Sequence, residues 1–136
     1  MRSSTTSSER PRVLLVDDNE AMLARVAALL SPDCVVVGAV TDGAAAIAAA
    51  GALRPDVIVL DISMAGMNGL EVAQQLRQRG STAAVVFLTV HEDEELVHAA
   101  RAAGAIGYVV KPRLAVDLTP AVREARAGRA FVSALR

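Results

Sequence analysis

The sequence is poor in cysteine and in aromatic residues: it has one cysteine, one tyrosine, two phenylalanines and no tryptophan. A single cysteine excludes an internal disulfide framework and a cysteine metal cluster. Because Cys34 lies in an apolar stretch, we expect it to be a small hydrophobic residue of the core. The scarcity of aromatic rings argues against surfaces that stack nucleic-acid bases or a flavin ring.

Long apolar runs and a large net charge are also missing. No run approaches the about 20 residues that a membrane span needs. The first ten residues lack the apolar segment of a secretory signal. The net charge is −1 and no basic stripe is present, which argues against nucleic-acid binding by these residues. We therefore expect a cytoplasmic protein without a membrane partner, with a disordered tail over residues 1–10.

What the sequence does contain is five short apolar runs, in a chain of 136 residues that suits one domain. The runs are rich in branched aliphatic residues and do not alternate apolar with polar positions. This pattern is typical of strands that are buried on both faces of a parallel sheet. The runs span residues 13–16, 34–37, 57–60, 85–88 and 106–110.

Segments with helical character separate these runs. The alanine-rich segment 42–50 is expected to be a helix that ends at Gly51. Asn68 and Glu71 have the spacing of a capping box at the start of the third helix. The acidic residues 92–95 are expected in the first turn of the fourth helix, where the helix dipole favours negative charge.

The last helix is expected over residues 117–127, with Pro120 in its first turn, where proline is tolerated. Strand and helix thus alternate five times along the chain. This alternation predicts a three-layer α/β sandwich with a parallel sheet. In such sheets the functional groups collect at the carboxyl ends of the strands.

Polar side chains follow four of the five apolar runs directly, and they are Asp17, Asp18, Asp61, Thr89 and Lys111. Crowded carboxylates repel one another unless a cation intervenes, and ligands that are all oxygen suit Mg²⁺. Such a cation, together with an ammonium group and a hydroxyl, would stabilise a phosphoryl group. A carboxylate can accept that group covalently, so the residues predict phosphoryl transfer to an aspartate.

Lys111 is the only lysine in a chain with thirteen arginines. An ammonium group acts at phosphate as a compact point charge, so its single use after the fifth run supports the phosphoryl site. Each polar residue taken alone has a structural explanation, with Asp18 or Thr89 as a helix cap and Asp61 as a turn residue. Taken together, polar groups after four strands are hard to explain as caps.

The sequence resembles the response regulator receiver family, whose fold is CheY-like (flavodoxin-like). The resemblance rests on four segments, which are VLLVDDNEAML, PDVIVLDISMAGMNGLE, VVFLTV and GYVVKP. It covers nearly the whole chain and implies a receiver domain over residues 11–128. It also implies a five-stranded parallel sheet in the order 2-1-3-4-5 with five helices.

The resemblance implies a role for each polar residue. Asp61 is the expected phosphoacceptor, and the expected cofactor is Mg²⁺, for which Mn²⁺ can substitute. The implied metal ligands are Asp17 (largely through a bound water), Asp18, Asp61 and the backbone carbonyl of Ser63. The implied phosphate-contacting and switch residues are Thr89, Lys111 and Tyr108. The bond between Lys111 and Pro112 is expected to be cis, as in the family.

Three positions depart from the family pattern or vary within it. Ala65 stands where the family usually has proline, so we expect a less rigid loop after the phosphoacceptor. Ser63 and His91 occupy positions that vary in the family and tune dephosphorylation.

The implied partners are a sensor histidine kinase and, on phosphorylation, a second copy of the chain. The last residues, AVREARAGRAFVSALR, resemble the final receiver helix and linker onset of regulators with a LuxR-type helix-turn-helix. We expect residues 129–136 to begin a linker to an output domain absent from this chain, and DNA binding only through that domain. The expected function is a signalling switch rather than an enzyme, with its output through the surface of the fourth helix, fifth strand and fifth helix.

Four other functions are compatible with part of this residue pattern. A stand-alone receiver or adaptor would carry the same residues. An aspartyl-phosphate phosphatase that depends on a metal would carry a second aspartate where this sequence has Ser63. A flavodoxin-type cofactor binder would need an uncharged loop in place of Asp17 and Asp18, because carboxylates repel phosphate. A degenerate receiver that only binds proteins is disfavoured because the acidic residues, Thr89 and Lys111 are all intact.

Overall fold

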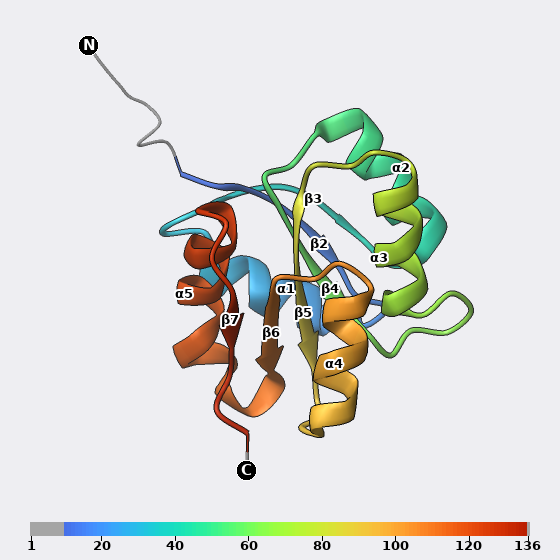
Figure 1. Ribbon diagram of the computed structural model, residues 1–136. Helices are drawn as coiled ribbons and strands as arrows, with labels where there is room; N and C mark the ends of the chain where they lie inside the picture. The colour runs from blue at the N-terminus through green and yellow to red at the C-terminus, as the bar shows by residue number, and fades with distance from the viewer. Residues whose placement is uncertain (1–9, 136) are drawn as a thin grey trace.

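The branched apolar runs form a parallel sheet in the computed structural model, which describes residues 10–135. Among these residues the sheet has six strands in the order β3-β2-β4-β5-β6-β7, and every pairing is parallel (Figure 1). The strands are β2 (Arg12–Val16), β3 (Val35–Val40), β4 (Val57–Asp61), β5 (Ala84–Thr89), β6 (Gly107–Val110) and β7 (Phe131–Val132).

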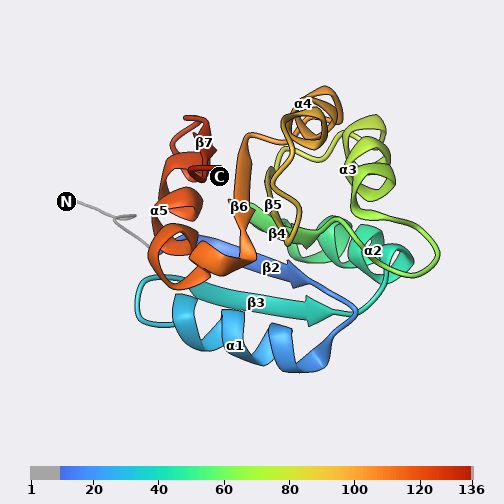
Figure 2. The same cartoon turned by 90° about the horizontal axis from the view of Figure 1, so that it is seen from below.

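Helices cover both faces of the sheet, which confirms the three-layer α/β sandwich (Figure 2). Two helices, α1 and α5, pack on one face, and α2, α3 and α4 pack on the other. The helices are α1 (Glu20–Leu30), α2 (Gly43–Leu53), α3 (Gly69–Gln78), α4 (Glu94–Ala102) and α5 (Leu114–Arg126). A single 3-10 turn, η1 (Lys111–Arg113), joins β6 to α5.

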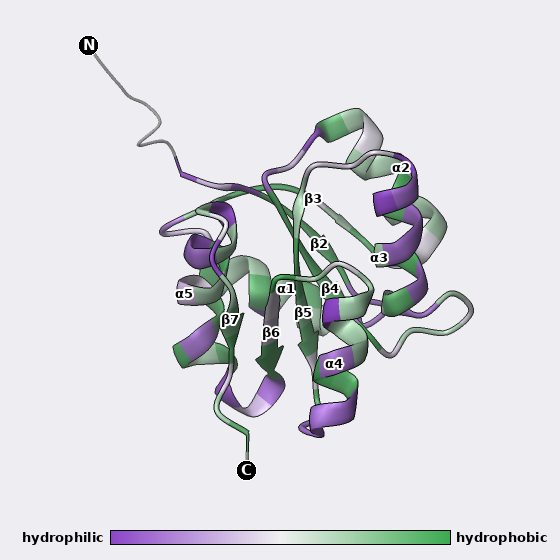
Figure 3. Ribbon diagram, viewed as in Figure 1, coloured by the Kyte–Doolittle hydropathy of each residue, from purple (hydrophilic) through white to green (hydrophobic). Residues whose placement is uncertain are grey.

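The core lies on the two faces of the central strands, where apolar residues concentrate (Figure 3). Every residue of β4 and β6 is buried, as continuous apolar runs predict. Strand β3 is an exception, because it lies at one edge of the sheet and most of its residues are only partly buried. Cys34, just before β3, is buried as expected, and this burial raises the pKa of its thiol.

The expected five-stranded sheet is wrong by one strand, because β7 pairs with β6 and extends the sheet. This strand comes from residues 129–136, the segment expected to begin a linker. It has two residues, which is too short for an apolar period to show in the sequence, and it forms because β6 offers an open edge. The expected tail over residues 1–10 lies, apart from Arg10, outside the described residues.

Two helix boundaries differ from expectation. Helix α2 runs through Gly51, because one glycine lowers the stability of a helix by only about 1 kcal/mol. The helix ends at Leu53, and the next residue, Arg54, has the left-handed conformation. Helix α5 begins at Leu114, so Pro120 lies inside it rather than in its first turn. Pro120 has no N–H, so the carbonyl of Val116 loses its intrahelical hydrogen-bond partner. Proline is tolerated there because both residues are exposed to water.

Two helix starts were expected from the sequence. The capping box of α3 is confirmed: Asn68 accepts a hydrogen bond from the Glu71 N–H, and Glu71 accepts one from the Asn68 N–H. Helix α4 is acidic at its start, although only Glu94 and Glu95 lie in its first turn. Asp93 precedes the helix at the N-cap position, and its side chain makes no capping hydrogen bond. Among the described residues, none of the helices combines the length and apolar character that crossing a membrane requires.

Candidate functional site

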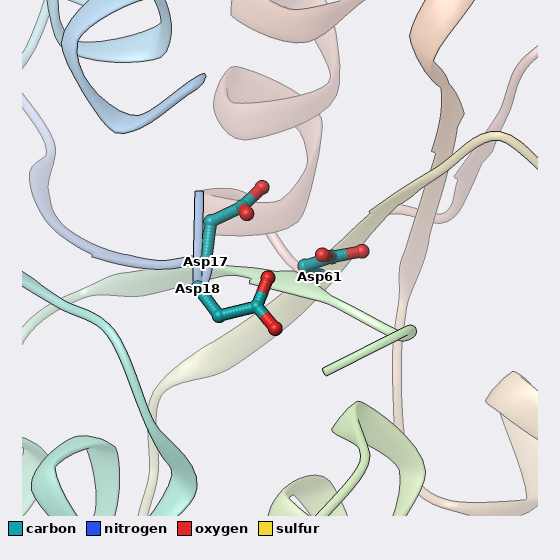
Figure 4. Close-up of side chains that lie close together, drawn as sticks. All are labelled: Asp17, Asp18 and Asp61. Carbon is teal, nitrogen blue, oxygen red and sulfur yellow. The ribbon is translucent and has the colours of Figure 1, made fainter. Parts of the chain in front are cut away.

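The carboxyl ends of two adjacent strands bring three carboxylates together. Val16 of β2 lies beside Leu60 of β4, so the residues that follow them, Asp17 and Asp61, become neighbours. One carboxylate oxygen from each of Asp17, Asp18 and Asp61 lies within 4.8 Å of the other two, and the three side chains are drawn in Figure 4. The predicted clustering of these residues at one edge of the sheet is therefore present in the structure.

Loop amides orient the two buried carboxylates. Asp17 Oδ1 accepts a hydrogen bond from the N–H of Asn19 at 2.8 Å, and Asp61 Oδ1 accepts one from the N–H of Ser63 at 3.2 Å. Only 4% of each aspartate is exposed. Hydrogen bonds to a charged acceptor hold its side chain in a defined direction, so both carboxylates are fixed before any ligand binds.

The third carboxylate, Asp18, is exposed, and its Oδ2 accepts a hydrogen bond from the N–H of Ala65 at 3.2 Å. A proline at position 65 has no N–H to donate. The departure from the family pattern at Ala65 therefore supplies a hydrogen bond to a candidate metal ligand. The sequence did not indicate this contact, because nothing in it shows that the loop folds back over Asp18.

The ammonium group of Lys111 lies against the two buried carboxylates. Its Nζ is 3.6 Å from Asp17 Oδ2 and 3.8 Å from Asp61 Oδ1. The Lys111 side chain is 19% exposed, so these ion pairs are largely screened from water. Lys111 comes from the end of β6, two strands away from β4 in the sheet, and reaches the site because parallel strands end at the same edge.

The surroundings of Asp61 disfavour the ionised form of its carboxyl group. Its pKa is raised from 3.8 to about 6, first by burial and then by the neighbouring Asp17 charge, with Lys111 acting in the opposite direction. In the same cluster Asp17 Oδ2 is buried and accepts no hydrogen bond from the described residues. Excess negative charge and an unsatisfied buried oxygen both fit a divalent cation with oxygen ligands.

Strand β5 ends in Thr89, and only 1% of Thr89 is exposed. Thr89 Oγ1 accepts a hydrogen bond from the N–H of His91 at 3.2 Å. The carbonyl of His91 accepts one from the hydroxyl of Tyr108 at 2.9 Å. Tyr108 is buried, which raises its pKa to about 12. The backbone of His91 therefore links the two expected switch residues, Thr89 and Tyr108.

The peptide bond between Lys111 and Pro112 is trans, which corrects the expected cis bond. The trans form is favoured for an X–Pro bond by about 0.5–1 kcal/mol. It also suits the local structure, because Pro112 lies in the 3-10 turn η1, where its fixed φ is compatible with helical geometry.

Two groups of polar contacts were not predicted. The exposed side chains of Ser63 and His91 meet, with 3.2 Å between Oγ and Nε2, although the sequence gives no sign that positions 28 residues apart are neighbours. Asp117 and Ser133 form a buried hydrogen bond of 2.7 Å next to β6. The expected ligand role of the Ser63 carbonyl stays a prediction.

Comparison with known proteins agrees with this geometry. Residues 13–123 match the family described as the response regulator receiver domain. The nitrate/nitrite response regulator protein NarL of Escherichia coli K12 is 38% identical over 130 residues, which cover 94% of this chain and 60% of that protein. The chain therefore spans less than two thirds of this curated relative.

Solved structures give the same result. The signal receiver domain of the putative response regulator NarL from Mycobacterium tuberculosis has a TM-score of 0.84 and 33% identity, over 89% of this chain and 99% of that one. A two-component response regulator of the LuxR family from Aurantimonas sp. has a TM-score of 0.81 and 28% identity, over 90% of this chain and 89% of that one.

Proposed function

The chain belongs to the response regulator receiver domain family, and on this premise we propose that it is a phosphorylation-dependent signalling switch with Asp61 as phosphoacceptor. The observation that carries the proposal is the convergence of Asp17, Asp18 and Asp61 beside the ammonium group of Lys111. Receiver domains are signalling domains rather than classical enzymes. The phosphoryl donor in this proposal is a sensor histidine kinase.

Asp61 acts as the nucleophile in the proposed transfer. One of its carboxylate oxygens forms a bond to phosphorus while the bond between phosphorus and the donor imidazole nitrogen breaks. The electron pair of the broken bond leaves with the nitrogen, and the product is an acyl phosphate on Asp61. Lys111 favours the ionised carboxylate that must attack, because its charge lowers a pKa that burial raises.

Asp17, Asp18 and Asp61 are the residues that would hold a divalent cation, together with the backbone carbonyl of Ser63. Bound there, Mg²⁺ supplies positive charge that offsets the negative charge of the transferring phosphoryl group. Asp17 Oδ2 supports this assignment, since it is buried without a hydrogen-bond donor among the described residues. Mn²⁺, which accepts similar oxygen ligands, is expected to substitute.

Lys111 and Thr89 are the groups that would hold the phosphoryl oxygens, by charge and by a donated hydroxyl hydrogen bond. A shift of Thr89 toward the phosphoryl group acts on His91, whose N–H now donates to Thr89 Oγ1. The carbonyl of His91 in turn holds the Tyr108 hydroxyl. Phosphorylation would thus change which arrangement of this loop and of Tyr108 is most stable, which is a population shift.

The proposed output surface consists of α4, β6 and α5. Because the curated relatives are longer than this chain, control of transcription through a DNA-binding domain is proposed for the whole protein rather than for the receiver. A homodimer on phosphorylation and a location in the cytoplasm belong to the same proposal.

Phosphate uptake tests the proposal directly. We expect the protein to gain the mass of one phosphoryl group when it is incubated with Mg²⁺ and acetyl phosphate. Asp61→Asn should abolish the gain, because an amide is not a nucleophile at phosphorus. Asp42→Asn is a matched control that keeps a side chain able to cap α2, and it should leave uptake intact. Uptake that persists in Asp61→Asn would overturn the assignment.

A further inference from the structure

The segment after α5 is hydrogen-bonded to the strand that ends in the site lysine. Strand β7 lies beside β6 at the edge of the sheet (Figures 1 and 2). The N–H of Phe131 donates to the carbonyl of Ile106 at 3.1 Å, and the N–H of Ser133 donates to the carbonyl of Tyr108 at 2.8 Å. This C-terminal segment is therefore in contact with the backbone of an expected switch residue.

Ser133 makes a second set of contacts through its side chain. Its hydroxyl oxygen accepts a hydrogen bond from the N–H of Val110 at 3.2 Å, and its hydroxyl group donates to Asp117 Oδ2 at 2.7 Å. Ser133 is only 2% exposed, and both contacts are buried. Val110 directly precedes Lys111, so the Ser133 hydroxyl fixes the chain on one side of the site lysine.

Asp117 fixes the chain on the other side of Lys111. Arg113, two residues after the lysine, donates from Nε to Asp117 Oδ2 at 2.8 Å and from Nη2 to Oδ1 at 3.3 Å. A bidentate pair of this kind is geometrically demanding. These hydrogen bonds hold the pKa of Asp117 below its usual range, so the carboxylate stays ionised and available to both partners.

Together these contacts form a closed ring, which we call the Ser133–Asp117 clamp: Val110 to Ser133, Ser133 to Asp117, and Asp117 to Arg113. Within the ring only Lys111 and Pro112 lie between the two fixed points. The ring uses groups from β6, η1, α5 and the segment after β7, so it depends on that segment staying docked on the sheet.

We propose that Ser133 and Asp117 are positioning residues for Lys111, and that docking of the segment after α5 and binding of a phosphoryl group at Asp61 therefore stabilise each other. The second half of this inference rests on the proposed function. Coupling between two sites is reciprocal, so a phosphoryl group that holds Lys111 also favours the clamped segment. Any chain that continues beyond this segment would then respond to phosphorylation.

A spectroscopic test of the clamp does not depend on phosphorylation. Because Lys111 is the only lysine, protein grown with labelled lysine gives one side-chain Cε signal for the site. Threonine and valine have nearly the same shape, so Ser133→Thr keeps the hydroxyl and Ser133→Val removes it, with a similar packing cost. We expect the signal to move toward that of a free lysine in Ser133→Val and to stay near the wild-type position in Ser133→Thr.

A binding test measures the coupling, with beryllofluoride and Mg²⁺ as the phosphoryl probe. We expect Ser133→Val and Asp117→Asn to weaken beryllofluoride binding about threefold to tenfold, in line with the loss of one buried hydrogen bond. Binding of Mg²⁺ alone should not weaken, since Lys111 repels that ion rather than holding it. Asp33→Asn is the matched control, because it weakens an exposed ion pair to Arg123 that lies outside both the clamp and the segment after α5.

The outcomes distinguish a failure of the proposed phosphoryl site from a failure of the Ser133–Asp117 clamp. If the wild-type protein fails to bind beryllofluoride, the proposed function fails, while the lysine signal still reports whether the clamp holds Lys111. If the wild-type protein binds the probe and Ser133→Val binds it equally well, the coupling is overturned. An unchanged lysine signal in Ser133→Val would overturn the positioning role. A fall in Mg²⁺ affinity equal to the fall in beryllofluoride affinity would also overturn the coupling, because the clamp would then affect the whole site rather than Lys111.

Discussion

Asp61 occupies a position that is unfavourable for an isolated carboxylate and favourable for a phosphoacceptor. Asp61 is buried and lies beside Asp17, and both features disfavour its ionised form. Lys111 compensates only in part, so the pKa of Asp61 is still raised to about 6. A site with excess negative charge binds a cation strongly, and the bound cation then favours an incoming phosphoryl group. The unfavourable surroundings of the Asp61 carboxylate therefore favour the binding of a cation at this site.

The same surroundings predict how stability depends on pH in the absence of divalent cations. Between pH 3.8 and about 6 the folded protein keeps the Asp61 proton that the unfolded chain has lost, so the free energy of unfolding falls as pH rises. Above about pH 6 this decrease in the free energy of unfolding is complete, and it amounts to roughly 2–3 kcal/mol.

Asp61→Asn should remove this decrease. We expect the variant to be more stable than the wild-type protein at pH 7.5 in a chelating buffer, and equally stable or less stable near pH 3.5. Urea unfolding at several pH values measures both. A variant that is less stable at each pH would contradict the account of Asp61.

Lys111 should act in opposite directions on the two ligands of the site. Its Nζ lies 3.6 and 3.8 Å from two candidate metal ligands, so it competes with a cation for them. We expect Lys111→Met to raise Mg²⁺ affinity severalfold and to weaken beryllofluoride binding by at least tenfold, as measured by calorimetry. Lys111→Arg keeps the charge and should restore part of the beryllofluoride affinity. A loss of affinity for both ligands in Lys111→Met would indicate a damaged site.

At the residue scale, the sequence was informative about which side chains meet and silent about how loops orient them. Asp17, Asp61 and Lys111 could be predicted to converge because each follows an apolar run. The hydrogen bond from Ala65 to Asp18 could not be predicted, because it depends on the path of a loop. The trans bond before Pro112 could not be predicted either, since the two isomers differ little in energy.

At the scale of elements, the start of α3 is packed against the phosphoacceptor itself. A Cβ atom added to Gly69, the first residue of α3, would collide with the carbonyl oxygen of Asp61 and lie 2.8 Å from the Cα of Ile62. Neither atom can move without shifting the end of β4. Glycine at this position therefore allows the helix to approach the strand that carries Asp61.

A pair of glycine substitutions tests this packing. We expect Gly69→Ala to destabilise the protein by about 1–3 kcal/mol, as overpacking of a core does, and to reduce phosphorylation. Gly51→Ala in α2 is the matched control, because its Cβ would meet nothing within 4 Å. It should stabilise the protein by about 0.5–1 kcal/mol. Thermal unfolding measures both, and a well-tolerated Gly69→Ala would contradict the close approach.

Element existence could be predicted here far better than element boundaries. The capping box of α3 has a local cause, so Asn68 and Glu71 identified it correctly. Helix α2 passes Gly51 because packing of its alanines outweighs one unfavourable residue. Strand β7 could not be predicted, since it exists only where β6 offers hydrogen-bond partners that lie more than twenty residues away in the chain.

At the scale of the whole molecule, cation binding should be linked to folding, because the ligands come from different elements. Asp17 and Asp18 follow β2 and Asp61 ends β4, so an unfolded chain does not present them together. We expect Mg²⁺ at a hundred times its dissociation constant to stabilise the protein by about 2.7 kcal/mol. Asp17→Asn should reduce this stabilisation sharply, and Asp42→Asn should leave it intact. Equal stabilisation of both variants would place the ion elsewhere.

The topology of the whole sheet explains why the sequence could predict that these polar side chains meet. Parallel strands end at the same edge, so the order of strands alone brings Asp17, Asp61, Thr89 and Lys111 together. The Ser133–Asp117 clamp escaped prediction for the opposite reason. It joins a strand end to a segment beyond the last helix, and no repeating pattern in the sequence relates the two.

Chemical trapping of the phosphorylated residue tests the central claim most directly. The protein is incubated with Mg²⁺ and acetyl phosphate, reduced with borohydride, which converts an aspartyl phosphate to homoserine, and analysed by peptide mass spectrometry. We predict homoserine at position 61, and only when both Mg²⁺ and the donor are present. Homoserine at another aspartate, or none at position 61 while the protein takes up phosphate, would contradict the account.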